Sequence, residues 1–202
     1  KDFQTITDLE PEHISAYSLT VEPETKLFNL VKNKKVLMPI EDIDIEQFLT
    51  TEEILSNNGY NHYEISNYCK ETKECKHNLH YWKLSPYLSF GPSAHSHDLK
   101  KRWWNVRSLD DYITSISSNK NPIQDSELLS REDNYNEIIL NGLRLSNGIN
   151  RDLLKEYQDI INNKSLEKIN KRWDCISITD KNIKLTNKGF LFVDEITQEL
   201  FI

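Results

Sequence analysis

The pattern of hydrophobic and polar positions changes character near residue 108. Before it, His13–Val21 (HISAYSLTV) is mostly apolar and rich in strand-forming residues, which predicts a buried strand ended by Pro23. Residues 2–10 are expected to form a helix that Pro11 stops. Because a helix followed at once by a buried strand is typical of an α/β layer, we expect the chain to enter such a layer in its middle.

A longer amphipathic segment follows. Residues 41–58 predict a helix with acids in its first turn and Gly59 as its C-cap. Its apolar stripe consists of Ile45, Phe48, Leu49 and Leu55. Residues 60–68 are aromatic and partly alternating, which predicts a strand, and the polar residues 69–80 predict a loop.

From Ser108 onward the pattern predicts successive helices and then a small hairpin. The helices are expected to begin at Ser108, Ser130, Asn150 and Ser165, followed by two strands in CISITDKNIKLT and a closing helix over 188–201. This order is similar to that of a winged-helix module. We therefore predict an α+β fold with two domains, residues 1–107 carrying the candidate ligand loops and residues 108–202 forming a helical, winged-helix-like domain.

Composition narrows the class of protein. The chain has 202 residues, of which 28% are charged and 37% hydrophobic, as in a globular protein with an aromatic core. It contains no apolar run long enough for a membrane span and no signal-peptide pattern, so we expect a cytoplasmic protein. The net charge of −7 opposes nucleic-acid binding, and residues 151–202 are electrically neutral, so we interpret that module as a packing or lid domain.

Metal-ligating side chains gather in one stretch of the chain, since residues 62–97 contain five of the six histidines. Cys69, Cys75, His77 and His80 offer the thiolate and imidazole groups that Zn²⁺ prefers, although C-x5-C-x-H-x2-H is not a recognised zinc spacing. Three cysteines are too few for a disulfide scaffold, so reduced thiols are expected. A zinc-stabilised interaction module remains one alternative, and an ordinary polar loop is the other.

The same stretch also suits a planar ligand. His77 and His80 offer axial ligands for a haem iron, and stacking faces come from Tyr81, Trp82, Trp103 and Trp104. The alternative is an aromatic core whose histidines are satisfied by hydrogen bonds.

Two further features are candidates for binding. In GPSAHS, small residues surround His95 and permit close approach of a ligand, although a tight turn has the same composition. Glu64 in YEISN is either a functional carboxylate or a cap at a strand end.

Six motifs resemble, in order, the HemN/HemW branch of radical S-adenosylmethionine (SAM) proteins. They are HISAYSLTVEPET, GYNHYEISNYC, HNLHYW, YLSFGPSAHS, RWWNVRSLDDYI and NGLRL, and the resemblance covers the whole chain. The branch contains oxygen-independent coproporphyrinogen III oxidase and a haem-binding chaperone type. The resemblance implies that residues 1–107 end a radical SAM (β/α) barrel and that residues 108–202 form a HemN-type C-terminal domain.

The resemblance also implies cofactors that this chain cannot hold alone. In the family, a CxxxCxxC motif binds a [4Fe–4S] cluster to which SAM is bound, and this motif is absent here. The chain is therefore expected to be a C-terminal half that is inactive by itself. Self-association through the exposed edge of the cut barrel is also expected.

Site residues follow from the resemblance as well. HNLHYW looks like the HNxxYW signature of the chaperone type, which implies haem binding by His77, flanked by Tyr81 and Trp82, with haem passed to an acceptor protein. By position, Ser18 and His95 would line the SAM pocket. The alternative within the branch is an oxidase that decarboxylates the propionates of coproporphyrinogen III.

Overall fold

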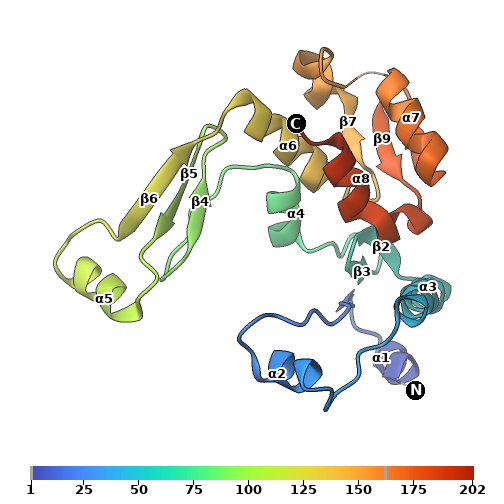
Figure 1. Cartoon of the computed structure of the whole chain (residues 1–202), viewed down its shortest axis with the longest axis horizontal. Coiled ribbons are helices and arrows are strands. Elements are labelled where there is room, and N and C mark those ends of the chain that lie inside the picture. The colour runs from blue at the N-terminus through green and yellow to red at the C-terminus, as the bar shows by residue number, and fades with distance from the viewer. Residues whose placement is uncertain (1, 162) are drawn as a thin grey trace. The chain divides into compact units, whose positions relative to one another are not determined.

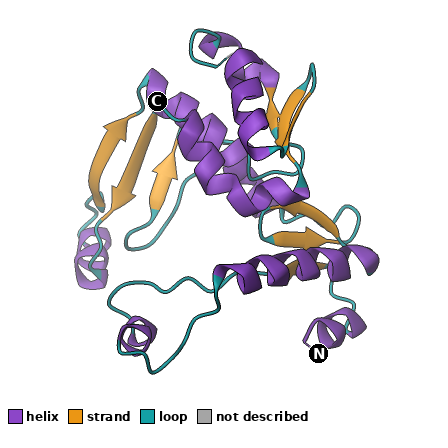
Figure 2. Ribbon diagram, turned by 45° about the vertical axis from the view of Figure 1, so that its right-hand side comes forward, coloured by secondary structure: helices purple, strands orange, loops and turns teal. Residues whose placement is uncertain are grey.

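The computed structural model describes residues 2–161 and 163–202, which form two compact units that meet in sequence at Cys75 and Lys76. The fold class is mixed α+β, as predicted. Helices alternate with three small antiparallel sheets of three strands each, and none of these sheets is closed within the described part of the chain (Figure 2). The division into domains at residues 107 and 108 stays a prediction.

The first unit contains one of these sheets and three helices. Its elements are α1 (Asp2–Asp8), β1 (His13–Ser15), α2 (Lys26–Lys32), α3 (Glu41–Asn57), β2 (Asn61–Glu64) and β3 (Asn67–Cys69) (Figure 1). The strand order is β1-β3-β2, so β3 lies in the centre. In this register Ser15 is opposite Asn67, and both are therefore next to the end of β2 at Glu64.

The strand expected over His13–Val21 is wrong in length and in its pairing. β1 ends at Ser15 and pairs with β3 in an antiparallel ladder, so the chain does not enter a parallel α/β layer here. Ala16 still donates its amide to Ser66 O at 2.8 Å. Beyond it, Tyr17 and Leu19 are 72% and 67% exposed. The apolar run ends as a strand because its partner β3 is only three residues long.

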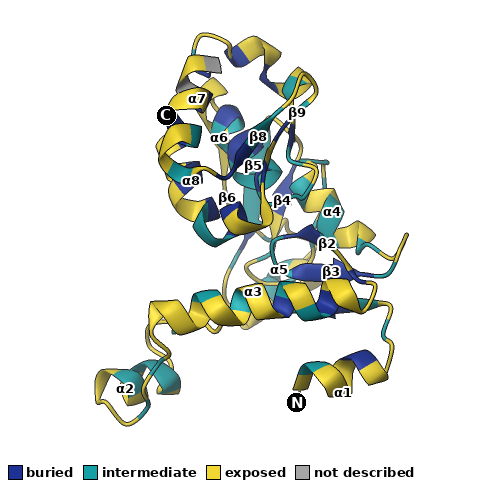
Figure 3. Cartoon of the chain, turned by 90° about the vertical axis from the view of Figure 1, so that its right-hand side faces the viewer, coloured by how far each residue is buried: buried dark blue, intermediate teal, exposed yellow. Residues whose placement is uncertain are grey.

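The core of the first unit forms where α3 meets the sheet. Ile14, Leu55, Tyr60 and Tyr68 make up the buried cluster. The predicted helix over 41–58 matches α3, but burial is confined to its second half, at Thr51 and Leu55 (Figure 3). The other members of the predicted stripe are half-buried or exposed.

The second unit is larger and contains two separate sheets. Its elements are α4 (Lys76–Trp82), β4 (His95–His97), β5 (Lys101–Asn105), α5 (Leu109–Ser117), β6 (Ile123–Leu128), α6 (Arg131–Gly142), β7 (Ile149–Asn150), η1 (Arg151–Tyr157), α7 (Asn163–Trp173), β8 (Ile176–Ile178), β9 (Asn182–Leu185), η2 (Asn187–Phe192) and α8 (Val193–Leu200). The sheets have the orders β4-β5-β6 and β7-β9-β8. The polar composition of residues 69–80 predicts a loop, but the helix α4 begins within this range, at Lys76.

The predicted helix starts are mostly confirmed by their caps. Ser108 accepts the amide of Asp111, and Ser130 forms a capping box with Asp133 at the start of α6. Asn150 begins a 3-10 helix rather than the expected α-helix. The hydroxyl of the buried Tyr135 donates to Leu200 O at 3.0 Å, which ties α6 to the end of α8.

Candidate functional site

His77 lies at the surface of the short helix α4. The Tyr81 hydroxyl, one turn further on, lies 3.3 Å from His77 Nε2, and the two rings meet edge to face with centroids 5.0 Å apart. Residues four apart lie on one helical face, so the imidazole and the phenol form a single exposed group. The structure thus presents the His77 imidazole at the surface, with its Nε2 beside the Tyr81 hydroxyl.

His80 has a different environment on the same helix. Its Nε2 lies 2.8 Å from the carbonyl oxygen of Pro86, and its own carbonyl accepts the amide of Ser85 at 3.0 Å. A carbonyl only accepts hydrogen bonds, so Nε2 carries the proton and has no lone pair for a metal. His80 therefore fixes the turn that follows α4.

A ladder of rings connects this helix to the sheet β4-β5-β6. Tyr81 meets Tyr87 edge to face at 4.6 Å, and Tyr87 exchanges backbone hydrogen bonds of 2.8 and 3.0 Å with His97. Burial raises the pKa of Tyr87. The buried His97 places Nε2 at 3.6 Å from Glu137 Oε2, while Glu137 Oε1 accepts from Arg102 at 2.9 Å. These contacts anchor the segment against which Tyr81 packs.

The two tryptophans of β5 lie on opposite faces of their sheet. Trp104 is opposite His95 and stacks on its ring at 5.6 Å, whereas Trp103 is opposite Ser96. Neighbouring residues of a strand point to opposite faces, so these two indoles cannot both flank one ligand ring. In α4, by contrast, Trp82 Nε1 is buried and lacks a hydrogen-bond partner among the described residues.

The residues predicted for a SAM pocket fall into different units. Ser18 lines a cavity of about 830 Å³ in the first unit, whereas His95 belongs to the second. Glu64 is 1% exposed and accepts a hydrogen bond from the Asn67 amide, while Ser15 donates to Asn67. Ser15 and Asn67 were not predicted from sequence, because only the strand register brings them to Glu64.

The zinc alternative finds no support in the described residues. They contain no group of three or more His, Cys, Asp or Glu side chains arranged to hold a metal ion. Cys69 is fully buried, and burial raises the pKa of its thiol, which opposes the thiolate form that zinc requires. Within the same described residues, no helix is long and apolar enough to cross a membrane.

Comparison with known proteins identifies relatives, although no family model matches the chain. The chain is 33% identical over 152 residues to heme chaperone HemW of Bacillus subtilis, covering 75% of this chain and 40% of that protein. It is 31% identical over 208 residues to the putative heme chaperone HemW-like protein of Buchnera aphidicola subsp. Baizongia pistaciae, covering 100% and 53%. The solved structure of Escherichia coli coproporphyrinogen III oxidase HemN, a radical SAM enzyme, superposes with a TM-score of 0.71 at 16% identity, covering 98% and 49%.

The chain belongs to the HemN/HemW branch, as its ordered motifs predict. Within that branch, one relative reported above is named heme chaperone HemW and the other putative heme chaperone HemW-like protein, whereas the likeness to the oxidase shows a shared fold. The chain spans about half the length of these relatives.

Proposed function

We propose that this chain is the haem-binding part of a HemW-type chaperone, in which His77 ligates the haem iron. The observation that carries the proposal is the contrast within α4. The exposed imidazole of His77 has only a long contact of 3.3 Å with the Tyr81 hydroxyl at Nε2, whereas the Nε2 of His80 lies 2.8 Å from Pro86 O. Haem is the cargo, and an acceptor protein receives it.

The chemistry around α4 suits this cargo. Tyr81 and Trp82 supply apolar ring surface for the macrocycle, and the buried Trp82 Nε1 has a hydrogen to donate. Lys76 and Lys83, both exposed, lie at the start of α4 and just after its end, where they can pair with the anionic propionates. The eight consecutive residues 76–83 thus offer an iron ligand, a stacking surface and two positive charges for the propionates.

Hemin titration into the 202-residue chain tests the ligand. We expect His77→Ala to weaken binding by about tenfold or more and to change the absorption spectrum of the bound haem, because an axial bond is lost. His80→Ala is the matched control, since it removes an imidazole from the same helix. Unchanged affinity and spectrum in His77→Ala would refute the assignment.

We further propose that the full-length protein carries the radical SAM cofactors. The portion outside this chain would bind the [4Fe–4S] cluster, and Ser18 and His95 would contribute to the SAM pocket. On this proposal residues 1–107 complete a barrel and residues 108–202 form a winged-helix-like packing domain in a cytoplasmic protein. The hairpin β8–β9 beside α7 and α8 supports the comparison with a winged helix.

The oxidase reading makes a separate prediction about the full-length protein. An oxidase converts coproporphyrinogen III anaerobically: the SAM-derived radical takes a hydrogen atom from a propionate side chain, which then loses carbon dioxide and an electron to become a vinyl group. A chaperone does not carry out this reaction. The identities of 31% and 33% to chaperone-named relatives favour the chaperone. Product formation by full-length protein in an anaerobic assay would favour the oxidase.

Self-association is proposed through β1. This strand is at the edge of its sheet, and the exposed Tyr17 and Leu19 lie two and four residues after its end. An unpaired edge with apolar neighbours favours pairing with a second chain. Light scattering across a concentration series should show a dimer that Tyr17→Lys weakens, and a monomer at every concentration would refute this proposal.

A further inference from the structure

The charges of residues 151–202 are unevenly distributed. The segment is neutral as a whole, yet α7 carries four basic side chains and one acidic side chain. They are Lys164, Lys168, Lys171 and Arg172, together with Glu167. Because residues three and four apart lie on one helical face, the three lysines form a positive stripe along α7. The neutral composition therefore conceals a local excess of positive charge.

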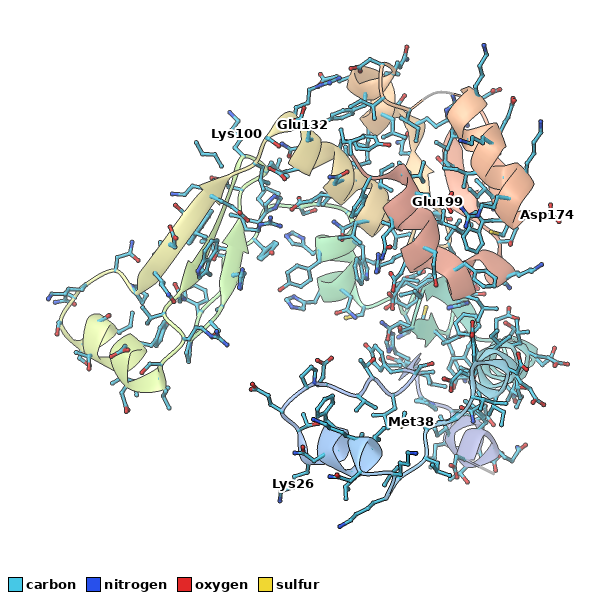
Figure 4. The ribbon with its side chains drawn as sticks, in the orientation of Figure 1. Lys26, Met38, Lys100, Glu132, Asp174 and Glu199 are labelled. Carbon is cyan, nitrogen blue, oxygen red and sulfur yellow. The ribbon has the colours of Figure 1, made fainter. Side chains whose placement is uncertain are left out.

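A hollow lies beside this stripe, between α7 and α8. Its volume is about 610 Å³, and it is lined by Lys168, Ile169, Lys171, Arg172 and Glu199, the last of which is labelled in Figure 4. Three cations and one anion leave this described lining with an excess of two positive charges. Ile169 is 7% exposed, so the lining offers charge rather than apolar surface.

Contacts around Glu199 hold one of the three cations in place. Glu199 Oε1 accepts from Arg172 Nη1 at 2.7 Å and from Trp173 Nε1 at 3.2 Å. The guanidinium also lies over the Trp173 ring, 5.2 Å from its centroid. The Arg172 side chain is still 67% exposed, so a second carboxylate can reach it. Because the guanidinium is already ordered, little further side-chain entropy is lost when that carboxylate binds.

Lys168 and Lys171 are the unpaired cations of the hollow. Both are exposed, and among the described residues neither forms an ion pair. Like charges three or four residues apart destabilise a helix, and Lys168 is in this relation to both Lys171 and Arg172. An anion bound among them removes this repulsion, so the hollow favours an anionic partner.

The size of the charge excess indicates what kind of anion fits. Two carboxylates four residues apart on a helix neutralise an excess of two charges. Their spacing equals that of Lys168 and Arg172 on α7, so the two helices can face each other with opposite charges in register. The hollow therefore matches a helix with glutamate or aspartate on successive turns.

Other anionic partners match the surface less well. Duplex nucleic acid gains affinity when many phosphates are neutralised, but the turn of the hairpin β8–β9, which follows α7, places Asp180 next to Lys181. A membrane surface takes up exposed apolar side chains, whereas Leu166 and Ile169 of α7 are buried. An acidic protein segment is the favoured partner.

We propose that the hollow between α7 and α8 is a docking surface for an acidic helical segment of a partner protein, recognised by Lys168, Lys171 and Arg172. Exposed charges supply the binding energy, so binding is weak and falls as the salt concentration rises. The inference goes beyond the proposed haem binding and does not depend on His77 as a ligand.

Two labelled peptides test the proposal on the 202-residue chain. Both are alanine-based peptides of about 20 residues, long enough to be helical in water, with either glutamate or glutamine at every fourth position. At about 100 mM salt we expect the glutamate peptide to bind about tenfold or more tightly than the glutamine peptide. Equal affinities, or no binding of the glutamate peptide, would overturn the proposal.

A pair of charge-reversed variants locates the binding site. Lys168→Glu combined with Lys171→Glu should weaken binding of the glutamate peptide by about tenfold or more. Lys181→Glu combined with Lys184→Glu is the matched control, because it changes the net charge equally at exposed lysines outside the lining. This control should change the affinity by less than about twofold. Equal losses would show that the peptide responds to net charge alone, which would overturn the site.

A variant of Glu199 tests the charge excess in the opposite direction. Glu199→Gln keeps an acceptor for Arg172 and Trp173 but removes the negative charge from the lining. The glutamate peptide should therefore bind about twofold to threefold more tightly. Weaker binding would contradict the role of the charge excess.

The remaining readouts separate this proposal from its alternatives. A DNA duplex of about 20 base pairs and vesicles containing phosphatidylserine represent the two other classes of partner. If either binds more tightly than the glutamate peptide and is lost in the Lys168 and Lys171 variant, the acidic segment is the wrong partner. Hemin affinity should be the same in this variant. If it falls because the second unit unfolds, Lys168→Gln combined with Lys171→Gln decides the question by the same peptide titration.

Discussion

His77 reaches Tyr81 within one turn of α4, whereas Ser15 reaches Glu64 only through Asn67, which is 52 residues away in sequence. The first pair is exposed, whereas the second network runs from the exposed Ser15 to the buried Asn67 and Glu64. An exposed local pair adjusts to a large cargo at little cost. In the second network only Asn67 and Glu64 are buried, and the pairing of β1 with β3 sets how Ser15 meets them.

The charges around the two sites differ in sign. Lys76 and Lys83 flank α4, whereas Asp2 and Asp44 line the cavity. A porphyrin with two propionates is therefore expected to bind at α4 rather than at the acidic lining of the cavity. The predictions below test how far the two sites differ, beginning with the largest expected effect.

Removing core volume should damage the cavity network most. Leu55 is completely buried in the cluster with Ile14 and Tyr68, so Leu55→Ala should lower the free energy of unfolding of the first unit by about 3 kcal/mol. Leu49→Ala, at a 43% exposed site on the same helix, should cost less than about 1 kcal/mol. Urea unfolding followed by labelling of the buried Cys69 thiol measures both. Equal losses of unfolding free energy in Leu55→Ala and Leu49→Ala would contradict the confinement of core packing to the second half of α3.

The second unit, which carries His77, should depend for its stability on the ion pair between Arg102 and Glu137. Glu137 accepts from Arg102 and is 17% exposed, so Glu137→Gln should cost the second unit about 1–2 kcal/mol. Glu127 also pairs with Arg102 but is 47% exposed, and Glu127→Gln should cost less than about 0.5 kcal/mol. All four tryptophans lie in this unit, so their fluorescence reports its unfolding. Similar losses of stability in the two variants would contradict a larger contribution from Glu137, the less exposed partner of Arg102.

Acid should destabilise the first unit through its histidines. Burial lowers the pKa of His62, against opposing effects of the Ile65 carbonyl and Glu52, and burial also lowers the pKa of His13. The unfolded chain therefore binds these protons first, near its usual pKa of about 6.5. Stability is full above that pH and falls below it, by at most about 1.4 kcal/mol per pH unit for each histidine.

A phenylalanine variant isolates the contribution of His62. The imidazole stacks on Tyr68 with ring centroids 4.1 Å apart, and His62→Phe keeps a ring there without a titrating group. Urea midpoints between about pH 5 and about pH 7.5, read from Cys69 labelling, should depend less steeply on pH in this variant. An unchanged slope would assign the acid sensitivity elsewhere.

Local features were predictable from sequence, and features that depend on register were not. The caps at Ser108 and Ser130 follow from neighbouring residues, and the motif around His77 lies on one helical turn. Ser15 and Asn67 meet because β1 pairs with β3, and no local pattern encodes that pairing. β6 was missed because all six of its residues are exposed, so it shows no alternation of apolar and polar positions.

The smallest expected effect comes from removing the Tyr81 hydroxyl, which lies beside the proposed ligand nitrogen of His77. At 3.3 Å and at the surface, the contact between Tyr81 and His77 Nε2 contributes less than about 1 kcal/mol, so Tyr81→Phe should change hemin affinity by less than about fivefold. Hemin should bind more tightly to this variant, because His77 Nε2 no longer has to lose a hydrogen bond from Tyr81 before it binds the iron. Tyr87→Phe is the control, since its ring packs on Tyr81 without reaching His77. Equilibrium titration measures this effect, and a loss as large as that in His77→Ala would make the phenol of Tyr81 a ligand in its own right.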